Sequence, residues 1–169
     1  MVRVGPSTQV GNSDTNATDF SAGIINGIQI NKFFSLGIGA EATTFVYENV
    51  GTPSRVMIYP VFLDARFYEA RLTVQPMFGF QMGYAWVGNK KDGSGNSHVR
   101  IEPETGAGGL HFGFNAGVRF PVTKGLAIML DGGFTIQKLH DTKPAVPVDQ
   151  VAAIRGNIGV SWNFGAAKK

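Results

Sequence analysis

The feature that most constrains this chain is an alternation of apolar and polar side chains that recurs along most of its length. From residue 72 to 86 every second side chain is large and apolar or a proline, and those between are mainly Thr, Gln and Gly. Residues 110–122, 126–137 and 154–164 repeat the pattern. Because successive side chains of a strand point to opposite faces, this period of two predicts strands with two chemically different faces.

Four more segments follow the alternation less strictly, which brings the expected number of strands to eight. They cover residues 2–10, 20–30, 34–42 and 57–67. The segment 2–10 is poorest in apolar residues and is the weakest of the eight. Ile58 and Phe62 break the pattern, since they share the face of Asp64 and Arg66.

The expected connections alternate between short and long. Short turns are expected at residues 31–32, 69–71 and 123–125, and long loops rich in Gly, Asn, Ser and Pro at 11–19, 48–55, 88–109 and 140–149. This order places both termini at the short-turn end, as in outer-membrane barrels. Prolines cannot donate to a strand ladder, so strand ends or bulges are expected near Pro60, Pro76 and Pro121.

The low content of charged residues supports a single domain that lies in a membrane. Only 16% of the residues are charged, yet no apolar run reaches the roughly 18 residues of a membrane-spanning helix. We expect residues 1–164 to form a single barrel domain and residues 165–169 a short C-terminal tail, natural or added. The first residues lack the apolar core of a secretory signal, so an exported chain is expected to be in its mature form.

Charge and cysteine content exclude several functions. The chain has no cysteine, which excludes disulfides and thiol chemistry. Its net charge of +3 comes from scattered basic residues, and nucleic-acid binding is therefore not expected. The three histidines show no metal-ligand spacing, so neither a metal nor another cofactor is expected.

The charged residues in the strands decide which face meets lipid. An eight-stranded barrel is only just wide enough for side chains to fill it, so the many large apolar groups cannot lie inside. The charged residues expected inside are Glu41, Asp64, Arg66, Arg119, Asp131 and Arg155. Three acids and three bases could pair, whereas an Arg facing the bilayer midplane costs about 2–4 kcal/mol. The fold class predicted is therefore all-β, an eight-stranded antiparallel up-and-down transmembrane β-barrel, and a soluble lipocalin-like barrel is the rival.

Aromatic residues near the strand ends fit the two membrane interfaces. Tyr59, Tyr84 and Trp86 lie toward the long-loop end, and Phe120 lies toward the short-turn end. We expect them to form interfacial girdles.

Stretches such as "YPVFLDARFYEARLTVQPMFGFQMGY", "FGFNAGVRFPVTKGLAIMLDGGFTIQ" and "IRGNIGVSWNF" resemble the small outer-membrane β-barrel proteins of Gram-negative bacteria, the OmpA-like and OmpX-like superfamily. The resemblance implies an outer-membrane location, with long loops extracellular and termini periplasmic. It also implies that Val160, Trp162 and Phe164 form the terminal signal read by the barrel-assembly machinery.

Three functions remain open at this point. A structural or surface-interaction barrel with a plugged polar interior is favoured, with membrane lipids and lipopolysaccharide as partners and the monomer as its expected state. A narrow pore or a hydrophobic-ligand conduit is the alternative. A lipid A-modifying enzyme is less favoured, because Ser97 and His98 resemble loop chemistry and no catalytic residues are predicted.

Overall fold

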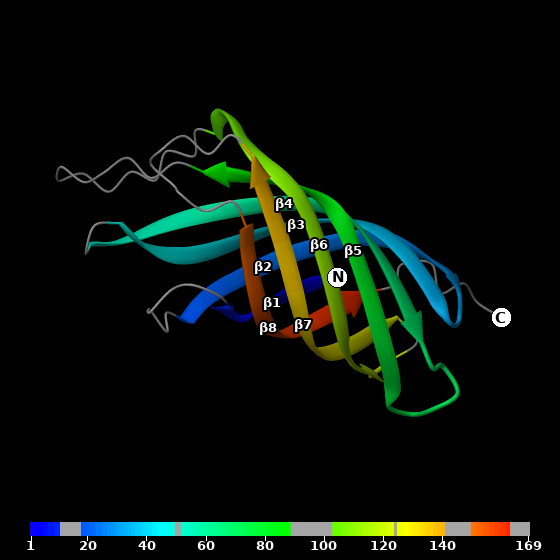
Figure 1. Cartoon of the computed structure of the whole chain (residues 1–169). Coiled ribbons are helices and arrows are strands. Elements are labelled where there is room, and N and C mark those ends of the chain that lie inside the picture. Colours follow the sequence, from blue (N-terminus) through cyan, green and yellow to red (C-terminus); the bar gives the residue numbers. More distant parts are fainter. Residues whose placement is uncertain (11–17, 50–51, 89–102, 124, 141–149, 163–169) are drawn as a thin grey trace.

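The computed structural model describes residues 1–10, 18–49, 52–88, 103–123, 125–140 and 150–162. They form eight strands and a single closed sheet (Figure 1). The strands are β1 (Val2–Gln9), β2 (Thr18–Asn31), β3 (Phe34–Asn49), β4 (Thr52–Tyr68), β5 (Gln75–Gly88), β6 (Pro103–Pro121), β7 (Leu126–His140) and β8 (Gln150–Trp162). No helix in this part of the chain could cross a membrane.

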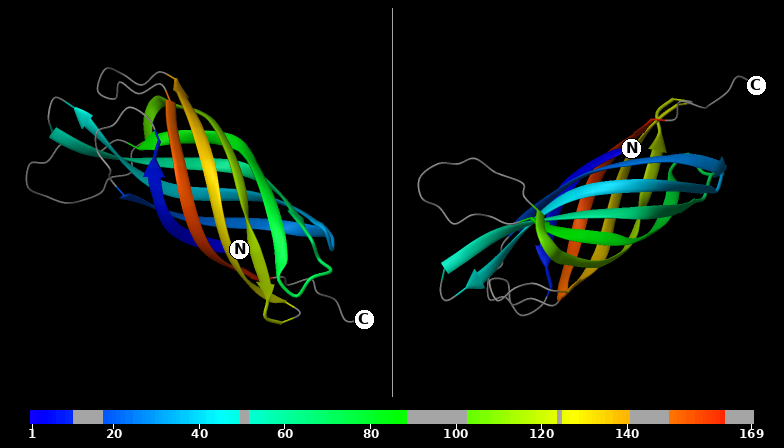
Figure 2. Two further views of the ribbon diagram at one scale, coloured as in Figure 1. Left: turned by 60° about the horizontal axis from the view of Figure 1, so that its bottom comes forward. Right: turned by 90° about the horizontal axis from the view of Figure 1, so that it is seen from above.

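Each strand pairs antiparallel with its neighbours in the sequence, and β1 pairs with β8 to close the barrel. Val2 lies opposite Val160, and Arg3 lies opposite Gly159. The predicted fold class is therefore confirmed, including the weakly signalled first strand. The strands wind around one axis, with the N-terminus near the short connections (Figure 2).

The two faces of the sheet divide as the alternation indicates. Large apolar side chains such as Phe78, Phe114 and Ile158 are exposed on the outside. Polar and charged side chains are buried inside, among them Gln81 and Asn115. This arrangement is the inverse of a water-soluble protein and suits a surface bathed in hydrocarbon.

The loops predicted at 48–55 and 88–109 were too long, because strand pairing continues into them. The expected loop at 48–55 is wrong: Glu48 lies opposite Pro53 and Asn49 opposite Thr52, so only residues 50–51 connect the two strands. The β-favouring residues Phe45, Val46 and Val56 are consistent with this extension. The resulting β3–β4 hairpin projects beyond the rest of the barrel (Figure 1).

Two other boundaries also differ from the prediction. The expected loop 88–109 ends earlier, because β6 begins at Pro103, with an irregular register between Trp86 and Gly88 on β5. The turn expected at 69–71 instead spans residues 69–74. The backbone N–H of Glu69 donates to the carbonyl of Pro76 at 3.0 Å across this turn. β5 begins at Gln75 rather than at residue 72.

The prolines behave in two ways. Pro76 and Pro121 lie at strand ends, as expected. Pro60 instead lies in the middle of β4 with its ring buried, and the expected strand end or bulge is absent there. The pairs that would join Glu41 to Pro60 and Ala42 to Tyr59 are missing, while the register on both sides is unchanged. The barrel accommodates the missing donor by skipping two pairs.

Candidate functional site in the barrel interior

Glu41 on β3 is the centre of the buried charges. It accepts a hydrogen bond from Arg3 on β1 at 2.5 Å and another from Arg155 on β8. Thr43, two residues farther along β3, donates its hydroxyl to the same carboxylate at 3.0 Å. All these side chains are buried. One carboxylate thus holds two guanidinium groups that come from the two strands at the closing seam.

Gln81 on β5 connects this cluster to a second one. Its side-chain oxygen accepts from Arg3 at 3.2 Å and from Arg155 at 3.3 Å. Its side-chain nitrogen donates to Asp64 at 2.7 Å. Because one amide offers both an acceptor and donors, Gln81 can join two cations on one side to an anion on the other.

Asp64 and Arg66 form the second cluster, both on β4. Arg66 donates to the two oxygens of Asp64, at 2.6 Å from Nε and at 3.2 Å from the terminal nitrogen. The two residues are neighbours on one face of the strand, as their spacing of two requires. This two-point contact is the strong geometry for a guanidinium and a carboxylate.

Asp131 and Arg119 lie apart from these clusters. Asp131 on β7 is buried and accepts from the side-chain nitrogen of Asn157 at 2.8 Å. Arg119 on β6 is half-buried; it donates to Gln75 at 2.8 Å and lies over the ring of Tyr68. The structure therefore brings four of the six expected charges into one hydrogen-bonded group, through Gln81, and places the other two beside it.

Apolar side chains complete the filling of the interior. The ring of Phe62 is buried, stacks on His111 at a centroid distance of 5.3 Å, and lies under the guanidinium of Arg3 at 5.6 Å. Gly39 leaves room for it, because a Cβ there would lie 2.4 Å from the Phe62 ring. Ile58 is also buried, on the face that the sequence indicates. His111 therefore lies among interior side chains rather than on the lipid face.

Burying the charged side chains of the site is favourable in free energy only when all of them are present together. Removing a charge from water costs several kcal/mol, and the loss is recovered only when partners and hydrogen bonds are complete. Here the buried guanidinium groups of Arg3, Arg66 and Arg155 each contact a carboxylate. The arrangement can hold a narrow barrel shut; among the described residues, no three side chains are grouped as a metal ion would need.

Two members of the site were missed in the sequence. Arg3 could have been found, since it lies between Val2 and Val4, which are both exposed on the outside. Gln81 was assigned to the inner face, but its bridging role depends on which residues lie at its level across the barrel. Nothing within β5 signals that.

The remaining expected site residues that the structure describes lie on the outer surface. Tyr84 and Trp86 are exposed side by side on β5, with ring centroids 5.1 Å apart, and half-buried Tyr59 lies opposite Trp86 on β4. Phe120 is half-buried near the other end of the barrel. Val160 and Trp162 face outward at the end of β8. Phe164 lies outside the described residues, as do Ser97 and His98.

Comparison with protein-family models and with curated proteins finds no match. Among solved structures, the chain is similar to neisserial surface protein A, with 21% identity, a TM-score of 0.63, and 96% of this chain and 94% of that chain covered. It is also similar to the outer membrane enzyme PagL, with 10% identity, a TM-score of 0.53, and 93% and 96% covered. At these identities the likeness establishes the fold, which agrees with the resemblance to small outer-membrane barrels.

Proposed function

We propose, from the fold that the chain shares with neisserial surface protein A and PagL, that it is an integral outer-membrane barrel with a structural or surface-interaction role. Its interior is plugged by side chains, and it displays its long connections outside the cell while its termini face the periplasm. It works as a monomer among outer-membrane lipids and lipopolysaccharide. The likeness covers nearly the whole chain, which supports an assignment at the level of the barrel.

The observation that carries the plugged interior is a set of hydrogen bonds across the barrel. β1 and β5 are four strands apart in a closed sheet of eight and therefore lie on opposite walls. Arg3 on β1 donates to Gln81 on β5, and Arg155 on β8 donates to Glu41 on β3. β8 and β3 are three strands apart, so both bonds cross the lumen, and no wide aqueous path can pass at their level while they persist.

Single-channel recording in planar bilayers tests the plug. We expect the unaltered protein to show no sustained conductance. The double variant Glu41→Ser/Arg155→Ser removes one charge of each sign from the plug and should produce openings. The matched control Glu69→Ser/Arg71→Ser also removes one charge of each sign, but from an exposed pair 4.0 Å apart, and should stay closed. Sustained, ion-selective current through the unaltered protein would contradict the proposal and favour a narrow pore.

The proposal includes assembly through the end of the last strand. Val160 and Trp162 supply two of the three residues of the expected signal, both outward-facing at the short-turn end of β8. If the barrel-assembly machinery reads them, Trp162→Ser should lower the amount of protein in the outer membrane in cells. It should leave folding of the purified chain in detergent nearly unchanged. Equal loss in cells and in detergent would indicate a structural role instead.

The alternative to a structural role is a lipid-modifying enzyme, because the chain is similar in fold to the outer membrane enzyme PagL. Among the histidine side chains that the structure describes, that of His111 is buried against Phe62 and beside the plug, away from any lipid, which argues against a role for it in lipid chemistry. We therefore expect lipid A from cells that express the protein to have an unchanged mass spectrum. An altered acyl chain would refute the structural assignment.

A further inference from the structure

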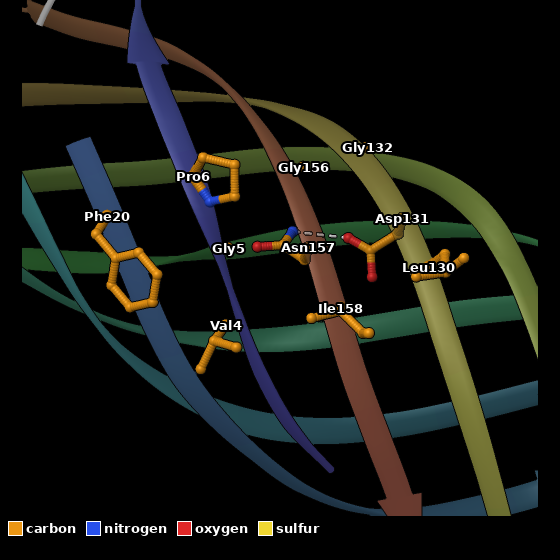
Figure 3. A pocket seen from close by; sticks show the side chains of 10 residues that line it. All are labelled: Val4, Gly5, Pro6, Phe20, Leu130, Asp131, Gly132, Gly156, Asn157 and Ile158. Carbon is orange, nitrogen blue, oxygen red and sulfur yellow. Dashed lines mark hydrogen bonds between the residues drawn. The ribbon is translucent and has the colours of Figure 1, made fainter. Parts of the chain in front are cut away.

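A hollow lies on the outer surface at the seam where the barrel closes, and we call it the seam groove. It has a volume of about 580 Å³ and is lined by residues of β1, β2, β7 and β8, all labelled in Figure 3. Ligand sites of proteins typically occupy roughly 300–1,000 Å³. The groove is therefore large enough to receive a chain-like ligand.

Missing side chains make the floor of the seam groove. Gly132 on β7 lies directly opposite Gly156 on β8, so two adjacent strands lack an outward side chain at the same level. A Cβ built at Gly156 would meet nothing within 4 Å, and one at Gly132 would lie 3.7 Å from its nearest neighbour. No side chain of the barrel therefore fills the hollow at these two glycines.

The pairing of the first strand with β8 is interrupted beside the hollow. Pairing between β1 and β8 runs through Val4 opposite Ile158 and resumes at Ser7 opposite Arg155, but Gly5 and Pro6 are skipped. Proline has no N–H to donate to the neighbouring strand. In Figure 3, Pro6 lies beside Gly156 at this interruption.

The walls of the groove are apolar and continue into the lipid-facing surface. Phe20, Leu130 and Ile158 are exposed around it, and beyond them lie Ile24, Ile128 and Ile154, which are also exposed. The polar residues Asp131 and Asn157 lie beneath, bonded to each other inside the barrel (Figure 3). The groove thus opens toward the hydrocarbon of the bilayer and offers it a slot bounded by apolar side chains.

We propose that the seam groove is a binding site for one acyl chain of a membrane phospholipid. The inference rests on the proposed membrane location. A lipid chain fits better than a second copy of the protein, because a stable protein interface involves about 20–30 residues on each side, whereas ten residues line the groove. An empty hollow would leave the atoms that line it without dispersion partners, and an acyl chain that fills the hollow restores these contacts.

Photolabelling tests the site. The protein is reconstituted in phosphatidylcholine vesicles that contain a small fraction of phosphatidylcholine with a diazirine in the middle of one acyl chain. After illumination, adducts are mapped by mass spectrometry. We expect labelling of residues 130–132 and 156–158 to exceed, by several-fold, that of the equally exposed face of β5 at Phe78, Phe80 and Met82.

Matched variants make the test specific. Gly156→Leu fills the groove and should abolish the excess labelling while leaving β5 unchanged. Ala40→Leu places the same side chain on the exposed face of β3, where it adds slightly less bulk, and should have no effect. Gly132→Leu is the second filling variant if Gly156→Leu fails to give the folded form on a heat-modifiability gel.

The outcomes separate the two proposals. Even labelling of the groove and β5, or excess labelling that survives both filling variants, would overturn the acyl-chain site and leave the membrane barrel standing. Labelling of the groove below that of β5, as a covering protein copy would cause, would also overturn it. Absence of labelling on every strand would refute the membrane location itself.

Discussion

At the scale of single residues, the interior is organised by groups that each satisfy several partners. Gln81 accepts from two arginines and donates to Asp64, and Glu41 accepts from two arginines and a hydroxyl. A buried residue of this kind cannot be replaced without leaving some of its partners unsatisfied. The cost of a substitution therefore falls mainly on those partners.

Neutralising Glu41 should expose this dependence. Glu41→Gln keeps the shape but leaves Arg3 and Arg155 buried without their carboxylate, and we expect a loss of about 3–5 kcal/mol in the free energy of unfolding. Urea unfolding in detergent micelles, followed by tryptophan fluorescence, measures it. Glu69→Gln removes an exposed carboxylate and should change the value by about 0.5 kcal/mol or less. Similar effects of the two substitutions would show that the buried pairs contribute little.

Glycines provide a second test at this scale. A Cβ at Gly83 would lie 2.0 Å from the backbone carbonyl oxygen of Val61 and 2.5 Å from the Cα of Phe62, so the two strands would have to separate. We expect Gly83→Ala to cost about 1–3 kcal/mol in the same unfolding experiment. Gly156→Ala meets nothing within 4 Å and should be close to neutral. Equal stability of the two variants would contradict the close approach of β4 and β5.

At the scale of elements, each strand has one face toward the outer surface and one toward the barrel interior. On β5, Phe78, Phe80 and Met82 face outward, while Met77 and Gln81 are buried inside. A shift of register by one residue would exchange these faces completely. The alternation therefore specifies register as well as secondary structure.

A charge placed on the outer face should cost most at mid-strand. We expect Phe80→Arg to reduce the free energy of unfolding in lipid vesicles by about 2–4 kcal/mol, and Val122→Arg, at the short-turn end, by about 0–1 kcal/mol. Both side chains are exposed in the barrel. A larger loss at Val122 would mean that the membrane does not surround the middle of β5.

The fold could be predicted from the sequence because its signal is local, whereas the site depends on pairing across the barrel. The outward Val2 and Val4 alone are enough to place Arg3 inside. The prediction of a loop at 48–55 was wrong because β3 and β4 continue to pair with each other there. The alternation does not show which residues pair across strands, such as Glu48 with Pro53. The contact of Arg155 with Glu41 joins residues far apart in the chain, and no local pattern encodes it.

At the scale of the whole molecule, the barrel has its polar groups inside and its apolar groups outside. Its outer surface therefore resembles the interior of a water-soluble protein, and its interior resembles the surface of one. Such a molecule gains from hydrocarbon around it, and in water it would present a continuous apolar band.

We expect the chain to fold only when detergent or lipid is supplied. Strand content by circular dichroism and a heat-dependent shift on a gel should appear in micelles, and aggregation should occur after dilution into plain buffer. A folded monomer in plain buffer, by sedimentation, would support the soluble lipocalin-like barrel instead. Recovery of the shift on adding detergent to the aggregate provides the control for damage to the chain.

The pairing of β1 with β8 has a consequence for how the molecule is made. The first strand finds its second neighbour only when the last strand arrives, so until then the sheet has two open edges that can pair with other chains. Contacts between such distant segments form slowly. Each copy must therefore be kept apart from its neighbours while its sheet closes, and a truncation within β8, which leaves both edges open, should cause aggregation.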